Sequence, residues 1–582
     1  MQDAESQGLT LLKKASVSGR RDDVKETIRL YDEGLAKFEQ VRARAAFSEL
    51  KRSYMEKVYG HYEDAALYML EKEEGEKAFQ YIEAMKARMF LDQLAEARVD
   101  LEKGIDPEVK KERDQLENKA LMLKKRLAEE NQAKYPDKKL VEELRNNLSA
   151  AQEKLDALTR EIRYKNPLYA SVEYPRPISA KALQDNVLQD NEALLEYFLT
   201  KKRVYCLVIG KSGFHIVTLP AKYEDITARV QKMLANIRAY QQGERLRENL
   251  ARDLYDLLVK PVEEHIEGKT LIIAPQGILA YLPFEALVTE KNGEKIFMVE
   301  KYPMTYIQSG TVLGVLRSQH STDNTQGGFV GFGDPVYDFQ EYLKETDAAG
   351  KESATGEGKE GERISDRKAK PAGGDPSPGA VFVKDLYLRS GGTPTRLKGT
   401  AEEIEAIDSL YDKTGARHQK YLRINASEEK AKSPEMARYS YIHFSTHGIL
   451  QPGFQAIALS QIPSDREDGF LTLGEIMNTR FNARLVVLSA CETGLGDVSN
   501  AEGVTGLTRA VMYAGSPAAL VSLWSVADEP TRDLMTLFYE GLIDKNLSKI
   551  DALRTAKIAL LKDKKTGFNH PFFWSAFVLY GE

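Results

Sequence analysis

The sequence predicts a chain of two parts, an α-helical region followed by a larger α/β region. Three observations lead to this fold class. Apolar residues recur at helical spacing from the N-terminus to about residue 165. After Pro167, short apolar runs typical of buried strands alternate with helical stretches, which favours a largely parallel sheet. The same alternation returns in the final third of the chain, beyond a polar segment.

Composition and charge exclude several classes of protein. The 582 residues are 42% hydrophobic and 29% charged, which indicates a core-forming chain of at least two domains. Lys and Arg number 82 against 88 Asp and Glu, a net charge of −6. This balance argues against a nucleic-acid binder held by bulk charge. We read the basic run at 119–126 as a solvated helix face, and expect no direct nucleic-acid binding.

The sequence carries no membrane or secretion signal that we can identify. No apolar run reaches the ~18 residues that a membrane span requires, and the first twenty residues lack the apolar core of a signal peptide. We therefore expect no direct membrane contact. The two cysteines, Cys206 and Cys491, are far apart in sequence, which argues against a disulfide framework and favours the reducing cytoplasm.

The first helical unit spans residues 1–98. Helical patterns cover 24–44, 63–70 and 77–94, with Gly75 between the last two. Two helices joined by a short glycine-containing turn resemble a degenerate tetratricopeptide repeat. About three such repeats are needed to bury their faces, and we count at most two. The array is therefore expected to be part of a longer one or to be completed by a partner.

A second helical unit spans residues 99–167. Leucines before Pro136 and apolar residues after it form matching stripes at heptad spacing. The simplest arrangement is an antiparallel hairpin that turns near 135–137 and serves as a packing strut. The stripe residues are Leu116, Leu123 and Leu127 on one side of the turn, and Leu144, Leu148, Leu155, Leu158 and Ile162 on the other.

The α/β region is interrupted by a polar segment. Between 344 and 380 the only large aliphatic residue is Ile364, so we expect a disordered surface insertion. Strands are predicted at 193–200, 203–209, 271–274, 329–332, 439–447, 485–490 and 518–524. Helices are predicted at 249–259, 502–514, 531–541 and 549–561.

Two of these strands end in reactive side chains, His447 and Cys491. Sites in open α/β sheets form beyond the carboxyl ends of strands, so neighbouring strands would bring imidazole and thiol together. A free thiol has a pKa of ~8.5, and a nearby histidine makes it a nucleophile. The N–H groups of Gly448 and Cys491 would form an oxyanion hole, each donor worth ~3 kcal/mol. The alternative is an inert, buried strand-end cysteine.

A series of sequence motifs follows the chain in a fixed order. They are KAFQYIEAMKARMFLDQLA (77–95), LIIAPQGILAYLPFEAL (271–287), LKGTAEEIEAI (397–407), HFSTHG (443–448), LTLGEI (471–476), VVLSACETGLG (486–496), GVTGLTRAVMYAGSPAALVSLWSVAD (503–528) and HPFFWSAFVLYG (570–581). With the motifs from 443 onward, residues 439–582 resemble the CHAT domain, a caspase- and separase-related cysteine peptidase family often joined to tetratricopeptide repeats. The earlier motifs match as well, so the resemblance covers nearly the whole chain from about residue 60. The motifs are specific in combination and in this order.

The resemblance implies a caspase-like fold with His447 as base and Cys491 as nucleophile. Their separation of 44 residues is close to the ~50 of caspases. The caspase pattern Q-A-C-x-G is not met, so aspartate specificity does not carry over. By the same resemblance, 168–318 is an inactive caspase-like half whose Cys206 is core, and 319–582 is the catalytic half. The alternative is a non-catalytic caspase-like scaffold.

Substrate preference rests on acidic residues near the site. In separase-like relatives an acidic residue of the W-x-V-x-D stretch lines the pocket for a basic P1 side chain. By that resemblance Asp528 pairs with Arg or Lys, and Asp497 and Glu502 are weaker candidates. The alternatives are a helix N-cap for Asp528 and solvated loop carboxylates for the other two.

We expect neither a metal nor another cofactor. His443 and His447 lie in a strand without H-E-x-x-H, which argues against zinc. His443 is expected to pack, as is His570 before the C-terminal segment. The resemblance implies a protein substrate and a protein activator bound through the tetratricopeptide-like region. It also points to bacterial defence, with a CRISPR-associated effector as one such activator.

Overall fold

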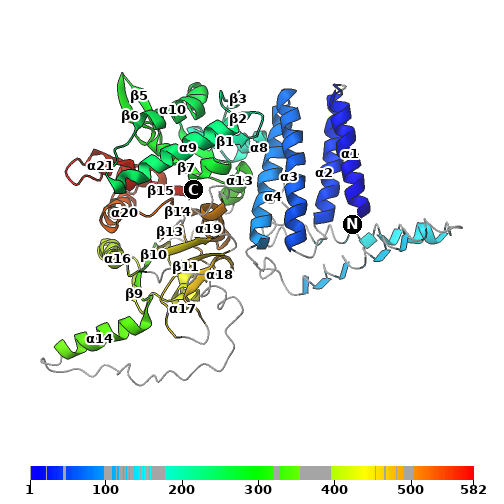
Figure 1. Ribbon diagram of the computed structural model, residues 1–582. Coiled ribbons are helices and arrows are strands. Elements are labelled where there is room, and N and C mark those ends of the chain that lie inside the picture. Colours follow the sequence, from blue (N-terminus) through cyan, green and yellow to red (C-terminus); the bar gives the residue numbers. More distant parts are fainter. Residues whose placement is uncertain are drawn as a thin grey trace.

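The computed structural model describes most of the chain. The described residues are 2–20, 22–42, 48–96, isolated positions between 108 and 158, 177–318, 327–353, 395–451, 454–463, 467–479, 481–490 and 502–582. Within them, a helical region lies beside a large α/β part (Figure 1). This confirms the predicted fold class. Among the described helices, none combines the length and hydropathy needed to cross a bilayer.

The helical region consists of two antiparallel helix pairs (Figure 1). Its apolar face includes Leu12, Leu35, Phe79 and Ile82, all buried. The expected helices at 24–44 and 77–94 are confirmed, and a further helix precedes them. Most of the expected hairpin at 99–167 lies outside the described residues. The four helices are α1 (Gln2–Arg20), α2 (Val24–Arg42), α3 (Ser48–Glu71) and α4 (Gly75–Glu96).

The α/β part is built on one sheet of 13 strands, in the order β12-β11-β10-β13-β14-β15-β7-β4-β1-β2-β3, with β8 and β9 attached to β10. A separate hairpin is formed by β5 and β6. The first strands are β1 (Glu192–Leu199), β2 (Val204–Gly210), β3 (Gly213–Thr218), β4 (Thr270–Ala274), β5 (Val288–Lys291), β6 (Glu294–Phe297) and β7 (Met304–Tyr306). The later ones are β8 (Phe329–Pro335), β9 (His418–Arg423), β10 (Tyr441–Gln451), β11 (Phe454–Ala458), β12 (Phe470–Thr472), β13 (Leu485–Ala490), β14 (Ala518–Ser522) and β15 (Phe577–Gly581).

The sheet contains two sets of parallel strands that run in opposite directions. β1, β4 and β7 are parallel to one another, and so are β8, β10, β13 and β14. β15 joins the sets, because it pairs in parallel with β7 and antiparallel with β14. The sheet is therefore mixed rather than largely parallel. As a consequence, the carboxyl ends of the two sets lie at opposite edges.

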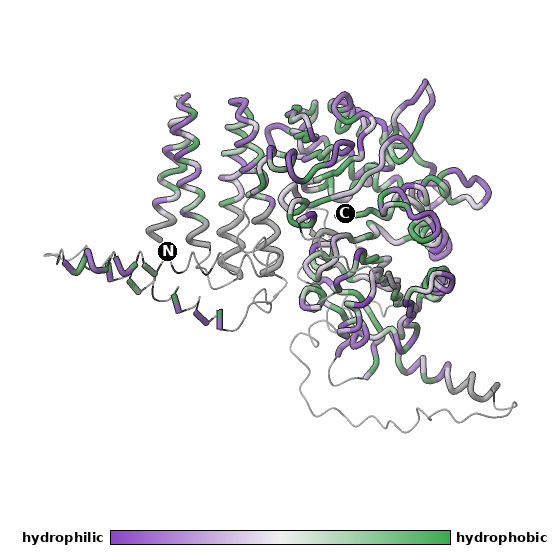
Figure 2. Tube along the Cα trace, turned by 180° about the vertical axis from the view of Figure 1, so that it is seen from behind, coloured by the Kyte–Doolittle hydropathy of each residue, from purple (hydrophilic) through white to green (hydrophobic). Residues whose placement is uncertain are grey.

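Helices cover the sheet and bury its apolar side chains. Figure 2 shows the hydrophobic stretches concentrated in the interior of the α/β part. Trp574, Phe198, Phe284 and Phe332 are among the largest buried side chains. The helices are α8 (Ala180–Asn186), α9 (Tyr223–Arg238), α10 (Glu248–Leu258), α11 (Glu263–Ile266), α12 (Met298–Lys301), α13 (Gly310–Ser318), α14 (Phe339–Ser353), α16 (Lys398–Tyr411), α17 (Glu428–Ala431), α18 (Leu473–Asn478), α19 (Glu502–Tyr513), α20 (Asp528–Ile543), α21 (Lys549–Lys562) and α22 (Pro571–Trp574).

Two expectations about local structure are wrong. The segment 344–380 was expected to be disordered, but its first ten residues continue α14 to Ser353. Glu345 on this helix pairs with Arg396 and Arg423, which holds the helix against the α/β part. Residues 354–394 lie outside the described ones. Second, β10 does not end at His447 but continues to Gln451, because it gains β11 as a new partner.

Candidate functional site

The site is organised by the end of a parallel strand ladder. β10 and β13 are hydrogen-bonded neighbours, and their register pairs Thr446 with Ala490 as the last residues of the ladder. The antiparallel pairing of β10 with β11 begins one residue later, at His447 and Ala458. The two strands are thus neighbours, the arrangement that would bring imidazole and thiol together. Cys491, which follows Ala490 in sequence, and Asp497 both lie outside the described residues.

The imidazole of His447 is held in one orientation. Its Nε2 lies 2.8 Å from the backbone carbonyl oxygen of Thr395. Because a carbonyl only accepts, Nε2 carries the proton in this contact and Nδ1 of the neutral ring keeps its lone pair. Nδ1 is buried and has no hydrogen-bond partner among the residues that the structure describes. This nitrogen is therefore the one placed to accept a proton.

Tyr337, just beyond β8, supports the same histidine from a second side. Its ring centroid lies 5.1 Å from that of His447. Its hydroxyl oxygen accepts a hydrogen bond of 3.2 Å from the backbone N–H of His447. This N–H faces the β8 side of β10. Successive N–H groups of a strand point to opposite edges, so the N–H of Gly448 points toward the edge where β13 ends.

A buried polar group lies behind His447 on the same face of β10. Residues two apart in a strand share a face, so His443 and Ser445 line up with His447. His443 Nε2 lies 2.8 Å from Glu403 Oε1, and the Ser445 hydroxyl donates to Glu403 Oε2 at 2.7 Å. All three side chains are buried. His443 thus packs, as predicted, and Glu403 on α16 fixes it.

Asp528 is the first residue of α20 rather than its N-cap, which is Ala527. The N-cap alternative is therefore wrong. The exposed carboxylate instead accepts a hydrogen bond of 3.2 Å from the backbone N–H of Gly399. A Cβ at position 399 would collide with the Asp528 side chain, so this approach requires glycine.

The surroundings of Asp528 place it on the same edge as His447. Partial burial raises the pKa of the Asp528 carboxyl, the Gly399 N–H opposes this, and the Glu403 and Glu402 carboxylates raise it further. A charged His447 lowers the pKa of Asp528. The third acidic candidate, Glu502, begins α19.

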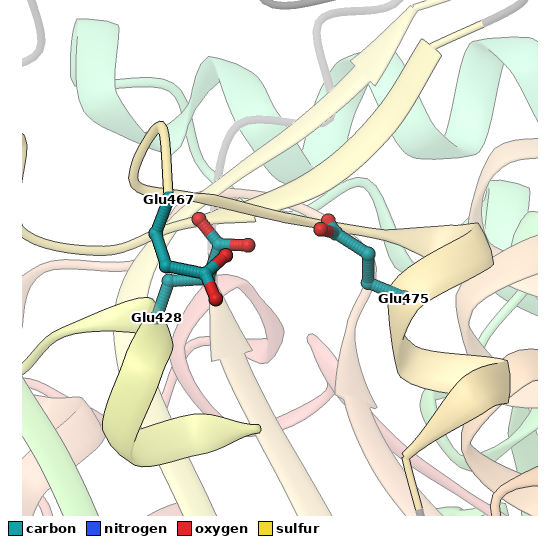
Figure 3. A group of neighbouring side chains, drawn as sticks. All are labelled: Glu428, Glu467 and Glu475. Carbon is teal, nitrogen blue, oxygen red and sulfur yellow. The ribbon is translucent and has the colours of Figure 1, made fainter. Parts of the chain in front are cut away.

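Three glutamates form an acidic cluster outside this site (Figure 3). They are Glu428 on α17, Glu475 on α18 and Glu467 before β12. The Lys432 ammonium lies 3.0, 2.9 and 2.5 Å from their respective carboxylates. Burial, with the neighbouring carboxylate of Glu475, raises the pKa of Glu428 to about 9. Lys432 supplies the positive charge that a metal would otherwise bring.

The remaining predicted residues have structural surroundings. Cys206 is fully buried in β2, and burial raises the pKa of its thiol. Its assignment to the core is confirmed. His570 accepts a hydrogen bond from the Phe572 N–H at the start of α22 and stacks on Tyr240. Burial lowers its pKa to about 4, which makes it a neutral packing residue as expected.

The sequence reasoning missed three residues that contact the site: Tyr337, Thr395 and Glu403. Tyr337 follows a predicted strand, and polar residues beyond strand ends are a general signal for a site. Glu403 is a buried carboxylate within the motif at 397–407, where a glutamate in a helical pattern gives no sign of burial. Thr395 contributes a backbone carbonyl, for which the sequence contains no signal.

Comparison with known proteins places the chain in a family. Tetratricopeptide repeat protein 28 of Mus musculus and its Homo sapiens counterpart are 23% identical to the chain over 343 residues, 57% of this chain but only 13% of theirs. A chain in the Saccharomyces cerevisiae separase–securin complex matches 99% of this chain and 50% of its own, at 10% identity and a TM-score of 0.37. Residues 248–582, more than half of the chain, match the CHAT domain. The chain therefore belongs to the CHAT domain family.

Proposed function

We propose that the chain is a cysteine endopeptidase of the caspase-like type that cuts a protein substrate with Cys491 and His447. One observation carries the proposal: the β10–β13 register ends at Thr446 and Ala490, directly before these two residues. The fixed imidazole supports it, because Nε2 is bound to the Thr395 carbonyl and Nδ1 keeps its lone pair. If Cys491 were an inert cysteine and His447 only a packing residue, the imidazole would not need to be held in this orientation.

In the proposed reaction, Nδ1 of His447 accepts the proton of the Cys491 thiol. The thiolate attacks the peptide carbonyl carbon, and the negative charge moves to the carbonyl oxygen. The N–H groups of Gly448 and Cys491 donate to that oxygen. The intermediate collapses, the amine leaves with the proton from His447, and an acyl-thioester remains. Water then attacks the thioester, which releases the acid and restores the thiol.

We propose Asp528 as the carboxylate that recognises a basic P1 side chain, with Asp497 and Glu502 as weaker candidates. Asp528 lies on the His447 edge, and its exposed carboxylate is oriented by Gly399. Because arginine binds a carboxylate with two parallel hydrogen bonds, cleavage after arginine is expected to exceed cleavage after lysine. The surrounding carboxylates Glu402 and Glu403 add negative potential that favours a basic side chain.

The helical region is the proposed docking site of a protein activator in the cytoplasm. A CRISPR-associated effector in bacterial defence is one candidate, carried over from the family resemblance. In the alternative, the CHAT domain is a non-catalytic scaffold that only binds proteins. The two functions differ in whether the chemistry at residue 491 matters. The scaffold predicts that Cys491→Ala leaves every phenotype intact.

The test is cleavage of a fluorogenic peptide library with varied P1 residues by wild type, Cys491→Ala and His447→Gln. Cleavage after Arg or Lys that both substitutions abolish supports the peptidase and the basic P1 preference. Cleavage after other residues would support Cys491 and His447 as catalytic residues and exclude Asp528 as the carboxylate that recognises P1. If wild type is silent, the assay is repeated with candidate partners bound. Continued silence with a bound partner that engages the helical region would favour the scaffold.

A further inference from the structure

The carbonyl that orients His447 belongs to a short stretch outside helices and strands. Thr395 to Leu397 precede α16, and both Thr395 and Arg396 are exposed. An exposed stretch of this kind has several accessible backbone conformations, and fixing each residue costs about 1–2 kcal/mol. A carbonyl held 2.8 Å from Nε2 therefore needs an anchor nearby.

The neighbouring residue provides this anchor. The Arg396 guanidinium donates from Nε to Asp334 Oδ1 at 2.9 Å and from Nη2 to Asp334 Oδ2 at 2.7 Å. Such a two-pronged pair fixes direction as well as distance. The Asp334 side chain is only 3% exposed, whereas that of Arg396 is 34% exposed. The fixed end of the pair is thus the aspartate inside the fold.

Asp334 is itself held in an unusual conformation at the end of β8. Its backbone φ is +44°, in the left-handed region that residues other than glycine rarely adopt. Its backbone N–H donates to the Thr400 hydroxyl at 2.7 Å. The preceding Gly333 allows α16 to approach, since a Cβ there would lie 2.6 Å from the Thr400 carbonyl oxygen. Strain of this kind persists where the surroundings overdetermine it, often at functional sites.

A second arginine and a second carboxylate complete the group. Arg423 Nη1 lies 3.3 Å from Asp334, and its Nη2 donates to Glu345 at 2.7 Å. Glu345 also accepts from Arg396 Nη1 at 3.3 Å. Two guanidinium groups thus share two carboxylates. The charges balance, and the buried aspartate is not left uncompensated.

We propose that Asp334 and Arg396 are positioning residues for the proposed peptidase, acting on His447 through the Thr395 carbonyl. The ion pair with Asp334 fixes Arg396 and with it the preceding Thr395 carbonyl. This carbonyl accepts a hydrogen bond from Nε2 of His447 and so keeps the imidazole proton on Nε2. Nδ1 is thereby kept available for the thiol proton. This inference rests on the proposed function for its catalytic consequence. Its structural content, the held imidazole N–H, is independent of any activity.

The test is a ¹H–¹⁵N spectrum of the full chain with ¹⁵N-labelled histidine. We expect a slowly exchanging imidazole N–H resonance that is assigned to His447 by its absence from His447→Gln. Arg396→Lys keeps the positive charge but cannot form the two parallel hydrogen bonds to Asp334. Asp334→Asn keeps the shape of the side chain but loses its negative charge. Both should lose the resonance. A misplaced imidazole should also lower kcat by up to ~100-fold with KM unchanged.

The matched control is Arg317→Gln, which breaks another two-pronged arginine–carboxylate pair, with Glu192, in the other half of the sheet. It should keep the resonance. Absence of the resonance from wild type, its persistence in both test variants, or its loss in the control would each overturn the proposal. If Asp334→Asn fails to fold, Arg396→Lys decides the matter, because its side chain lies at the surface. A resonance that depends on Arg396 in a chain that stays inactive with a partner bound to the helical region would support the positioning and refute the proposed function.

Discussion

The two sets of parallel strands differ in what fills their carboxyl ends. At the edge formed by β1, β4 and β7, helix α4 inserts polar side chains. Lys86 Nζ lies 2.8 Å from the fully buried Glu196 on β1 and 3.3 Å from the carbonyl of Ala274, the last residue of β4. Glu83 accepts hydrogen bonds from Gly310 and Thr311 at the start of α13, at 2.8 and 2.6 Å. This edge is closed by the helical region.

At the opposite edge, β8, β10 and β13 present His447 with one ring nitrogen bound and the other free of partners within the described part of the chain. The same strand architecture thus ends in a structural ion pair on one side and in an imidazole of fixed orientation on the other. The comparison teaches that strand topology alone does not decide which edge offers a titratable group without a partner. The decisive feature is whether the polar groups at the strand ends bind one another or leave a ring nitrogen without a partner among the described residues.

The largest expected effect is on catalysis, and it should differ between the two cysteines, which lie in different halves of the α/β part. Cys491→Ala should lower kcat/KM by about 10⁴-fold or more, because it removes the proposed nucleophile. Cys206→Ala should leave kcat/KM unchanged and lower the free energy of unfolding by about 1 kcal/mol, because Cys206 is buried core. Peptide hydrolysis and denaturant unfolding of both variants measure this. Equal kinetics in the two variants would contradict the assignment of chemistry to the second half.

The next effect concerns the closed edge. Lys86→Met should lower the free energy of unfolding by about 3–5 kcal/mol, because it leaves Glu196 buried without its partner. The double variant Lys86→Met/Glu196→Leu should recover most of this loss, since a buried ion pair is often replaceable by apolar side chains. Urea unfolding compares the three proteins. No recovery in the double variant would mean that the ion pair has a role beyond charge compensation.

The loss of stability in Lys86→Met should depend on pH, and the sign of this dependence follows from Glu196. Burial and the Glu83 carboxylate raise the folded-state pKa of Glu196 well above its ordinary value of 4.5. A group with a raised folded pKa stabilises the fold below its unfolded pKa, and this stability is lost as pH rises through the folded pKa. Lys86 lowers the pKa of Glu196, so its removal in Lys86→Met should raise that pKa further. The stability deficit of Lys86→Met should therefore be smallest at low pH, where Glu196 is protonated in both proteins, and should grow as pH rises through the folded-state pKa of Glu196 in wild type. A deficit that does not change with pH would show that Glu196 does not titrate over the pH range measured.

The smallest expected effect concerns Asp528, at the edge of the sheet where His447 lies. Asp528→Asn should lower kcat/KM for substrates with P1 arginine by about 10- to 100-fold, because a hydrogen bond to a charged group contributes roughly 1.5–3 kcal/mol. Substrates with neutral P1 residues should be unaffected. Asp533→Asn on the same helix is the control, as Asp533 pairs with Arg532. An equal loss for all substrates would assign Asp528 a structural role at Gly399.

Much of the fold followed from sequence patterns, and the missing parts have physical causes. The runs before His447 and Cys491 were recognisable as buried strands, and these strands proved to be neighbours. Strand β7, only three residues long, is too short for periodicity to reveal. Helix α1 lies in the predicted helical region, but its bounds were not predicted, because few of its described side chains are apolar and buried, among them Leu12 and Ala15. The extension of α14 depends on the long-range partners of Glu345.

The site was predictable where it depends on residue type and order, and not where it depends on packing. His447 stood out as a titratable group after an apolar strand. The anchor formed by Asp334 and Arg396 joins residues 62 positions apart. The contact of Asp528 with Gly399 spans 129 positions. Neither pair has a local signature, because the approach of α16 to β8 and α20 creates both.

The central claim is that His447 activates Cys491, and the pH dependence of thiol alkylation tests it without a substrate or an activator. Iodoacetamide reacts with the thiolate, and modification of each cysteine is followed by mass spectrometry. We predict that Cys491 of wild type reacts well below pH 8.5, the ordinary pKa of a thiol. In His447→Gln, reactivity should shift to about pH 8.5, while Cys206 stays unreactive in both. Identical pH profiles for Cys491 in the two proteins would contradict the claim.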